Sequence, residues 1–238
     1  MNSFFNRQYP VIQARIAAAA QKAGRKAEEV TLIAVTKNHP AETVREAVAA
    51  GLDQIGENKV QEARAKKEDC GPRGTWHLIG HLQSNKVKYV PALFDWVQSL
   101  DSIEIASALD ARAKEEGRRL KVLLQVNQAG ESQKFGVAPA QASALAKQIN
   151  ALSSLELCGL MTLAPYYEEV ERVRPVFAGL RETRDRVEKE TGLHLPELSM
   201  GMSADFEVAI EEGSTIVRLG TILFGARAKK AKDDAVDV

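Results

Sequence analysis

The sequence predicts a single (β/α)8 barrel, the TIM-barrel fold, with an extra helix at its N-terminus. Short apolar stretches alternate with stretches of helical periodicity along all 238 residues, and this alternation is typical of parallel βαβ units. Eight apolar stretches of this kind correspond to about 30 residues per unit, which matches a closed barrel of about 250 residues. A doubly wound open sheet is the alternative architecture.

The expected strands are short and rich in β-branched and other apolar residues. The first begins at Thr31 and runs toward Lys37, and Pro40 blocks further strand pairing. The other seven are expected at Asp53–Gly56, Thr75–Ile79, Trp96–Ser99, Lys121–Val126, Leu155–Met161, Glu197–Met200 and Thr215–Leu219.

The expected helices fill the intervening stretches. Before the first strand, Gln8–Ala23 reads as an amphipathic helix that Gly24 ends, with apolar residues at helical spacing: Val11, Ile12, Ile16 and Ala19. Further helices are expected near Glu42–Val48, Lys59–Lys67, Ser84–Val90, Ile103–Glu116, Pro139–Asn150, Glu168–Glu190 and Ala204–Glu211. No linker divides residues 1–227, and we expect a solvated tail at 228–238.

Composition excludes several classes of function. The 32 Lys and Arg residues balance 32 Asp and Glu residues, so nucleic-acid binding is not expected. The N-terminus lacks the apolar core of a signal peptide, and no apolar run is long enough to span a membrane. Cys70 and Cys158 stand far apart without a partner motif, which predicts neither disulfides nor a zinc site. We expect a cytoplasmic monomer.

Lys37 lies where the first strand ends. With period two, Lys37 shares a face with Ile33 and Val35, which places its amine at the C-terminal end of a buried strand. Active sites of (β/α)8 barrels lie at this end of the strands, and a desolvated lysine can act as a nucleophile toward aldehydes. The alternative is a lysine that marks the strand end and points into water.

Two turns of small residues follow the seventh and eighth strands. Ser203 is a plausible helix N-cap after the seventh strand, and Gly220 and Thr221 follow the eighth. Free backbone amides in such turns favour anions, and phosphate sites of this fold often form from these two loops. The pair of turns therefore predicts a phosphate site, although the turn at Ser203 taken alone is better explained by a simple helix cap.

Arg218 falls inside the expected eighth strand with apolar neighbours on all sides. Because desolvating a charge costs several kcal/mol, a buried guanidinium needs a partner. The partner is either a carboxylate, in a structural salt bridge, or an acceptor on a ligand.

Polar residues also follow the second, third and fifth strands. His81 lies among several polar residues after the third strand, where it lines the barrel mouth or caps the next helix, while Asn58 resembles an N-cap that also faces the mouth. His77 and His81 fall short of a metal-ligand set, so no metal is expected. Lys134 lies in a loop that either closes over a ligand or is solvated.

These segments together resemble the pyridoxal phosphate homeostasis protein family. The matching motifs are Ala34-Val35-Thr36-Lys37, Gly56-Glu57-Asn58, the run from His77 to Lys86, Lys134-Phe135-Gly136, Gly159-Leu160-Met161, the run from Ser199 to Ser203, and Arg218-Leu219-Gly220-Thr221. They extend in order over nearly the whole chain. One departure is threonine at position 36, where many members have serine.

The resemblance implies a barrel like the N-terminal domain of alanine racemase, with pyridoxal 5′-phosphate (PLP) held on Lys37 as an internal aldimine. It further implies phosphate contacts around Ser203, Gly220 and Thr221, and Arg218 against the pyridine nitrogen. Among the cofactor-binding residues it also includes Asn58 and His81.

The function implied is intracellular PLP homeostasis, in which a non-catalytic carrier buffers the cofactor or delivers it to PLP-dependent apo-enzymes. The alternative is an amino-acid racemase of the alanine racemase type. Such racemases carry a second, β-rich domain, and we expect none here because the chain ends shortly after the barrel. Weak racemase turnover stays open, since Lys37 could act as one general base.

Overall fold

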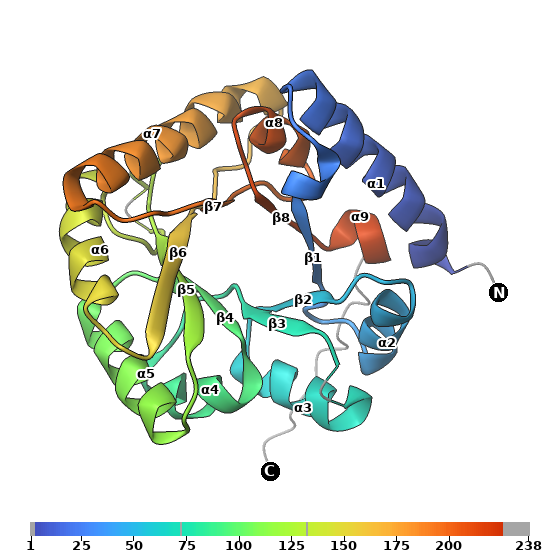
Figure 1. The fold of residues 1–238 in the computed structure, drawn as a ribbon. Coiled ribbons are helices and arrows are strands. Elements are labelled where there is room, and N and C mark those ends of the chain that lie inside the picture. Colours follow the sequence, from blue (N-terminus) through green and yellow to red (C-terminus); the bar gives the residue numbers. More distant parts are fainter. Residues whose placement is uncertain (1–2, 72, 132, 226–238) are drawn as a thin grey trace, which may run out of the picture.

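The computed structural model describes residues 3–71, 73–131 and 133–225, and over them the chain forms a closed barrel of eight parallel strands. The strands follow one another around the barrel in sequence order, and the first pairs with the last, Leu32 beside Val217 (Figure 1). This closure confirms the predicted barrel and excludes the open sheet. The expected tail at 228–238 lies outside the described residues.

The strands lie close to their expected positions. β6 has the predicted bounds, and the other strands differ from prediction by one or two residues at their ends. The strands are β1 Thr31–Val35, β2 Gln54–Glu57, β3 Thr75–Leu78, β4 Trp96–Leu100, β5 Leu120–Gln125, β6 Leu155–Met161, β7 Glu197–Ser199 and β8 Ile216–Leu219.

Helices surround the barrel on the outside (Figure 1). They are α1 Phe4–Lys22, α2 Ala41–Ala49, α3 Val60–Cys70, α4 Val90–Leu93, α5 Ile103–Glu115, α6 Ala142–Asn150, α7 Arg174–Thr191, α8 Phe206–Glu211 and α9 Thr221–Phe224, with 3₁₀ turns at Ala27–Glu29, Ser84–Tyr89, Pro139–Gln141 and Val170–Val173. The sequence did not predict α9.

Three segments predicted as single helices are interrupted. The stretch near Ser84–Val90 is a 3₁₀ turn followed by a short helix, and two longer stretches begin as 3₁₀ turns before α6 and α7. Proline explains the break before α7, because Pro175 lies in the first turn of that helix and has no N–H to continue a preceding one.

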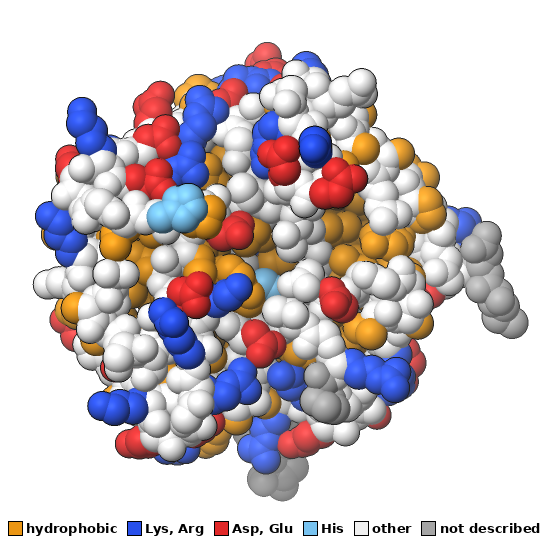
Figure 2. Space-filling model, in the orientation of Figure 1, with side chains coloured by type: hydrophobic (Ala, Val, Ile, Leu, Met, Phe, Trp, Pro, Cys, Tyr) orange, Lys and Arg blue, Asp and Glu red, His pale blue; other side chains and the backbone are white. Residues whose placement is uncertain are grey.

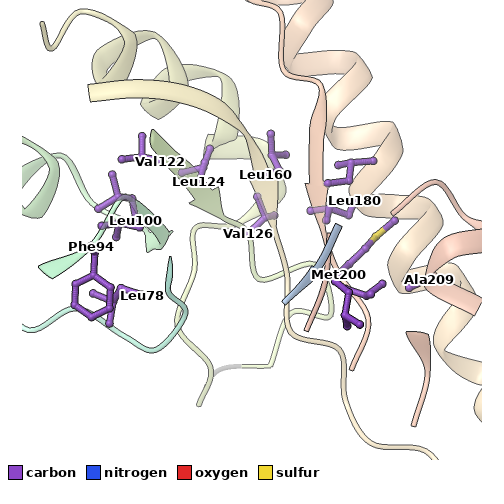
Figure 3. Close-up of a cluster of buried hydrophobic side chains, with 14 of the residues drawn as sticks. Leu78, Phe94, Leu100, Val122, Leu124, Val126, Leu160, Leu180, Met200 and Ala209 are labelled. Atoms are coloured by element: carbon purple, nitrogen blue, oxygen red, sulfur yellow. The ribbon is translucent and has the colours of Figure 1, made fainter. Parts of the chain in front are cut away.

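The buried side chains form an inner and an outer layer. Ile33 and Val35 belong to a small cluster inside the barrel, whereas Leu32 and Ala34 belong to the large cluster outside it. The period-two reading of β1 is therefore confirmed. Figure 3 shows part of the outer cluster, in which side chains of the strands gather with those of the surrounding helices, such as Leu180 of α7.

Helix α1 covers the place where the barrel closes. It packs beside α8 and α9 (Figure 1), and α9 has only four residues. Ile12, Ile16 and Ala19 are buried, whereas Val11 is 52% exposed. Including Val11 in the apolar face was wrong, because only positions 12, 16 and 19 recur at intervals of four and three residues. The helix also begins earlier than predicted, since Ser3 caps it by accepting a hydrogen bond from Asn6 N.

Charges of both signs are spread over the surface. On the face in Figure 2, basic and acidic side chains lie interspersed, with hydrophobic side chains visible between them. No helix within the described ranges combines the length and apolar character needed to cross a membrane.

Candidate functional site

A cavity of about 560 Å³ opens at the C-terminal end of the barrel. All seven residues selected from the sequence line it: Lys37, Asn58, His81, Ser203, Arg218, Gly220 and Thr221. They come from the ends of five different strands, so only barrel closure brings them together. Lys37 lines this cavity at the end of β1 and is half-buried there.

The backbone on both sides of Lys37 is fixed by a buried polar network. Lys66 of α3 donates to Thr36 O at 2.6 Å, to Glu57 Oε1 at 2.6 Å and to Glu62 Oε1 at 2.9 Å. The hydroxyl of Thr36 donates to the same Glu57 oxygen at 2.5 Å, and Asn38 N donates to Glu62. Residues 36 and 38 are thus held from α3 and β2, and the site of Lys37 is fixed between them.

Glu57 is completely buried in this network. Its second carboxylate oxygen has no hydrogen-bond partner among the described residues. Burial raises the pKa of Glu57 above its ordinary value, and the ion pair with Lys66 opposes that shift. Lys66 was not predicted from the sequence, because its position on α3 is typical of a surface lysine on a charged helix.

Arg218 is buried at the base of the cavity, with 4% of its surface exposed. One terminal nitrogen donates to Ser199 Oγ and the other to Thr162 O at 2.9 Å. Among the described residues, no carboxylate lies within salt-bridge distance of Arg218, so the structural salt bridge is excluded there. Burial lowers the pKa of Arg218 to about 10, while the nearby charge of Asp205 raises it, so the guanidinium remains a cation at neutral pH.

The turn after β7 is held by a carboxylate. Asp205 Oδ1 accepts a hydrogen bond from Met202 N at 2.6 Å. Gly201 has a φ of +95°, and a side chain there would come within 2.6 Å of Ala209 Cβ. Asp205, not Ser203, holds the N-cap position of α8, so the predicted capping role of Ser203 is wrong. Ser203 instead lines the cavity.

After β8 the backbone passes close to β1. A Cβ on Gly220 would lie 3.0 Å from Val35 O, so a side chain would press the two strand ends apart. Thr221 begins α9 directly after this glycine. The two small-residue turns predicted from the sequence therefore border one cavity.

The remaining wall comes from the loops after β2, β3 and β5. Asn58 lines the cavity, whereas the N-cap position of α3 belongs to Lys59, so the capping interpretation of Asn58 is wrong. The ring of His81 stacks on Phe135, with centroids 3.6 Å apart. Lys134 and Phe135 both line the cavity, which places this loop at the mouth. Gln125 was not predicted either; it lines the cavity and donates to Phe135 O at 3.0 Å.

Comparisons with known proteins cover most of the chain, including the cavity residues. The family model described as "Alanine racemase, N-terminal domain" matches residues 11–228. A relative from Aquifex aeolicus, named "Pyridoxal phosphate homeostasis protein", is 45% identical over 214 residues, 90% of this chain and 94% of that protein. A relative of the same name from Pseudomonas aeruginosa is 45% identical over 217 residues, 91% of this chain and 93% of that protein.

The chain belongs to the pyridoxal phosphate homeostasis protein family.

Solved structures agree with this family membership. PipY of Synechococcus elongatus, in a structure with PLP bound, is 42% identical with a TM-score of 0.78, and the match covers 88% of this chain and all of PipY. A protein from Bifidobacterium adolescentis is 39% identical with a TM-score of 0.86, covering 93% of this chain and 94% of that one. Alanine racemase from Clostridium difficile, at 16% identity and a TM-score of 0.72, shares the fold.

Proposed function

We propose that this member of the pyridoxal phosphate homeostasis protein family binds PLP in the cavity at the barrel mouth, and that it buffers the cofactor or delivers it inside the cell. The observation that supports the proposal most is the meeting of an amine, a buried guanidinium and two small-residue turns in one cavity. The relatives carry this name, and PipY was solved with PLP bound.

The residues present fit the chemistry of PLP. A cavity of about 560 Å³ is in the range that proteins use for small ligands and cofactors. PLP supplies an aldehyde that combines with a primary amine, and a ring that can accept electrons from a bond broken at the carbon that carries that amine. Lys37 offers the amine, and we propose it as the residue that holds the cofactor covalently.

The phosphate is assigned to the turns after β7 and β8. We propose that Ser203 and Thr221 donate from their hydroxyls and that the backbone at Gly220 approaches closely, because it carries no side chain. Asn58 and His81 are assigned to the rim of the same site. The stack of His81 on Phe135 would then limit the access of water to the bound molecule.

Arg218 is assigned to the pyridine nitrogen. A guanidinium can only donate, so it hydrogen-bonds an unprotonated ring nitrogen and disfavours its protonated form. A neutral pyridine stabilises a developing carbanion less well than a protonated one.

Transfer of the cofactor tests the proposal. Protein loaded with PLP is incubated with an apo-enzyme that needs PLP, while an aldehyde-trapping reagent removes free cofactor. The carrier proposal predicts that the apo-enzyme gains activity despite the trap. Gain that disappears completely when the trap is present would mean that the protein only releases PLP into solution.

A second experiment separates the carrier from a racemase. Amino acids are incubated with the loaded protein in deuterated water, and exchange at Cα is followed. We expect exchange no faster than with free PLP. Sustained exchange at enzymatic rates would overturn the carrier proposal. We further propose that the protein acts in the cytoplasm and that it is a monomer. Size-exclusion chromatography with light scattering would test the monomeric state.

A further inference from the structure

A line of polar side chains crosses the interior of the barrel below the cavity. It runs from Arg218 on β8 through Ser199 on β7, Gln98 on β4 and His77 on β3 to Gln54 on β2. Gln54 lines a hollow at the opposite end of the barrel, together with the first residues of β3 and β4. The chain of hydrogen bonds thus connects the two ends of the molecule.

Each link has hydrogen-bond geometry. Arg218 donates to Ser199 Oγ, and Ser199 Oγ lies 2.7 Å from Gln98 Oε1. Gln98 Nε2 lies 3.1 Å from His77 Nδ1, and His77 Nε2 lies 2.9 Å from Gln54 Oε1. Gln98 and Ser199 are completely buried, and His77 is nearly so. A polar group buried this deeply costs free energy unless it is hydrogen-bonded. Each link therefore depends on its neighbours, because the loss of one would leave a buried polar group without a partner.

The direction of donation can be followed from the cavity end. A guanidinium only donates, so Ser199 accepts from it, and the hydroxyl of Ser199 in turn donates to Gln98 Oε1. The amide nitrogen of Gln98 then faces His77 and must donate to Nδ1. The imidazole is left with its hydrogen on Nε2.

The same direction follows from the opposite end. Gln54 Nε2 donates to the carboxylate of Asp53 at 2.9 Å, which only accepts. Gln54 Oε1 therefore faces His77 as an acceptor, and Nε2 of His77 must donate. The obligate acceptor at this end therefore fixes the tautomer of His77, and the bonds that start at Arg218 agree with it.

The electrostatics of His77 agree with this tautomer. Burial lowers the pKa of His77 from 6.5 to about 3, so the ring is neutral at physiological pH. A protonated ring would turn an N–H toward the amide hydrogens of Gln98, and the link would be lost.

We infer that Gln98 and His77 are positioning residues for Arg218. They hold the hydroxyl of Ser199 as an acceptor toward one guanidinium nitrogen, while Thr162 O holds the other, so the plane of the guanidinium is fixed in the cavity wall. Neither residue lines the cavity. This inference rests on the proposed function, in which Arg218 meets the ring nitrogen of PLP, and it assigns to the far half of the barrel an influence on that contact.

The first test needs no ligand. The ¹⁵N NMR signals of His77 in the ligand-free protein are expected to show the Nε2–H tautomer. Gln98→Glu replaces the donating amide with an accepting carboxylate, so Nδ1 of His77 is expected to gain a proton in that variant. An Nδ1–H tautomer in the unsubstituted protein, or a His77 signal that Gln98→Glu leaves unchanged, would disprove the chain.

The second test uses PLP. Gln98→Leu is expected to weaken PLP binding about tenfold, the equivalent of about 1.4 kcal/mol, and to shift the absorption band of the bound cofactor. The matched control is Ser214→Ala, which removes a buried hydroxyl between β7 and β8 but leaves the chain intact. The control is expected to keep both affinity and spectrum.

Two substitutions at His77 keep the inference testable if Gln98→Leu folds poorly. His77→Gln can accept from Gln98 and donate to Gln54, so it is expected to restore the spectrum that His77→Leu shifts. If the original protein binds PLP but all these variants share its affinity and spectrum, the inference fails and the proposed function stands. If the original protein does not bind PLP, the proposed function fails, and the NMR result still decides whether the chain exists.

Discussion

Arg218 is the residue that we assign to the ring nitrogen of PLP. Its guanidinium stays protonated although burial lowers its pKa to about 10. Two nitrogens are held by Ser199 and by the carbonyl of Thr162, so the side chain cannot turn to meet a ligand in another way. A fixed cation at this place decides which protonation state of a ring nitrogen is stable.

Arg218→Glu is expected to reverse that preference. A carboxylate accepts a hydrogen bond, so it favours a protonated ring nitrogen, and the absorption spectrum of bound PLP should change with it. Arg218→Lys keeps a cation that can only donate and serves as the control, with a smaller change. Spectra are compared at equal occupancy. Identical spectra for the Glu variant and the original protein would rule out the contact with the ring nitrogen.

His77 makes a prediction about stability and pH. The folded protein keeps the ring neutral down to about pH 3, whereas the unfolded chain takes up a proton below pH 6.5. The contribution of the neutral His77 ring to the free energy of unfolding is fully present above pH 6.5 and is lost as the pH falls toward 3. Between pH 6.5 and pH 4 the loss is about 3 kcal/mol. Denaturant unfolding at both pH values should show a loss that is larger by this amount in the original protein than in His77→Gln; equal losses would contradict the burial of a neutral ring.

At the scale of elements, α3 holds the turn that carries Lys37. The helix reaches across to β1 through Lys66, which is 5% exposed and bonds to the backbone of Thr36 as well as to Glu57. A buried ion pair of this kind adds little stability compared with apolar residues, but removing one partner leaves a buried charge behind. Its role here is to fix the strand end.

Lys66→Met is expected to lower the free energy of unfolding by about 3–5 kcal/mol, because Glu57 loses its partner. The control is Arg64→Met on the same helix, which breaks an exposed pair with Glu68 and should cost less than about 1 kcal/mol. Adding Glu57→Gln to Lys66→Met should restore part of the stability. Equal effects of Lys66→Met and Arg64→Met in denaturant unfolding would show that the network does not act as a buried unit.

The elements also show what local sequence can predict. Period-two burial in β1 and the helix spacing around the barrel are local signals, so strand positions followed from the sequence within one or two residues. Helix caps did not follow from the sequence. Asp205 and Lys59 hold the N-cap positions of α8 and α3, although Ser203 and Asn58 are of residue types that commonly cap helices. Ser203 and Asn58 were nevertheless correctly placed at the mouth, since that placement depends on barrel topology.

At the scale of the whole molecule, the site forms only when the barrel closes. The seven cavity residues were selected because they follow strands, and closure alone brings strands one and eight together. The polar line through the interior could not be predicted, because it joins β2, β3, β4, β7 and β8 across the barrel. Nothing near Gln98 in the sequence indicates that its partners are His77 and Ser199.

Helix α1 makes the closure testable. Ile12→Ala is expected to lower the free energy of unfolding by about 2–4 kcal/mol, because its buried side chain fills the contact of α1 with the barrel. Val11→Ala on the same helix is the control, since Val11 is 52% exposed and should contribute less than about 0.5 kcal/mol. Similar losses in the two variants would contradict the packing of α1 over the junction of β8 and β1.

The central claim is that Lys37 holds PLP in this cavity, and reduction with borohydride tests it most directly. Protein incubated with PLP is reduced, digested and mapped by mass spectrometry. We expect the pyridoxyl group on Lys37, a Lys37→Ala variant without the absorption band of the bound cofactor, and an unchanged band in the control Lys147→Ala, whose lysine lies exposed on α6. A label on another lysine, or an undiminished band in Lys37→Ala, would contradict the account.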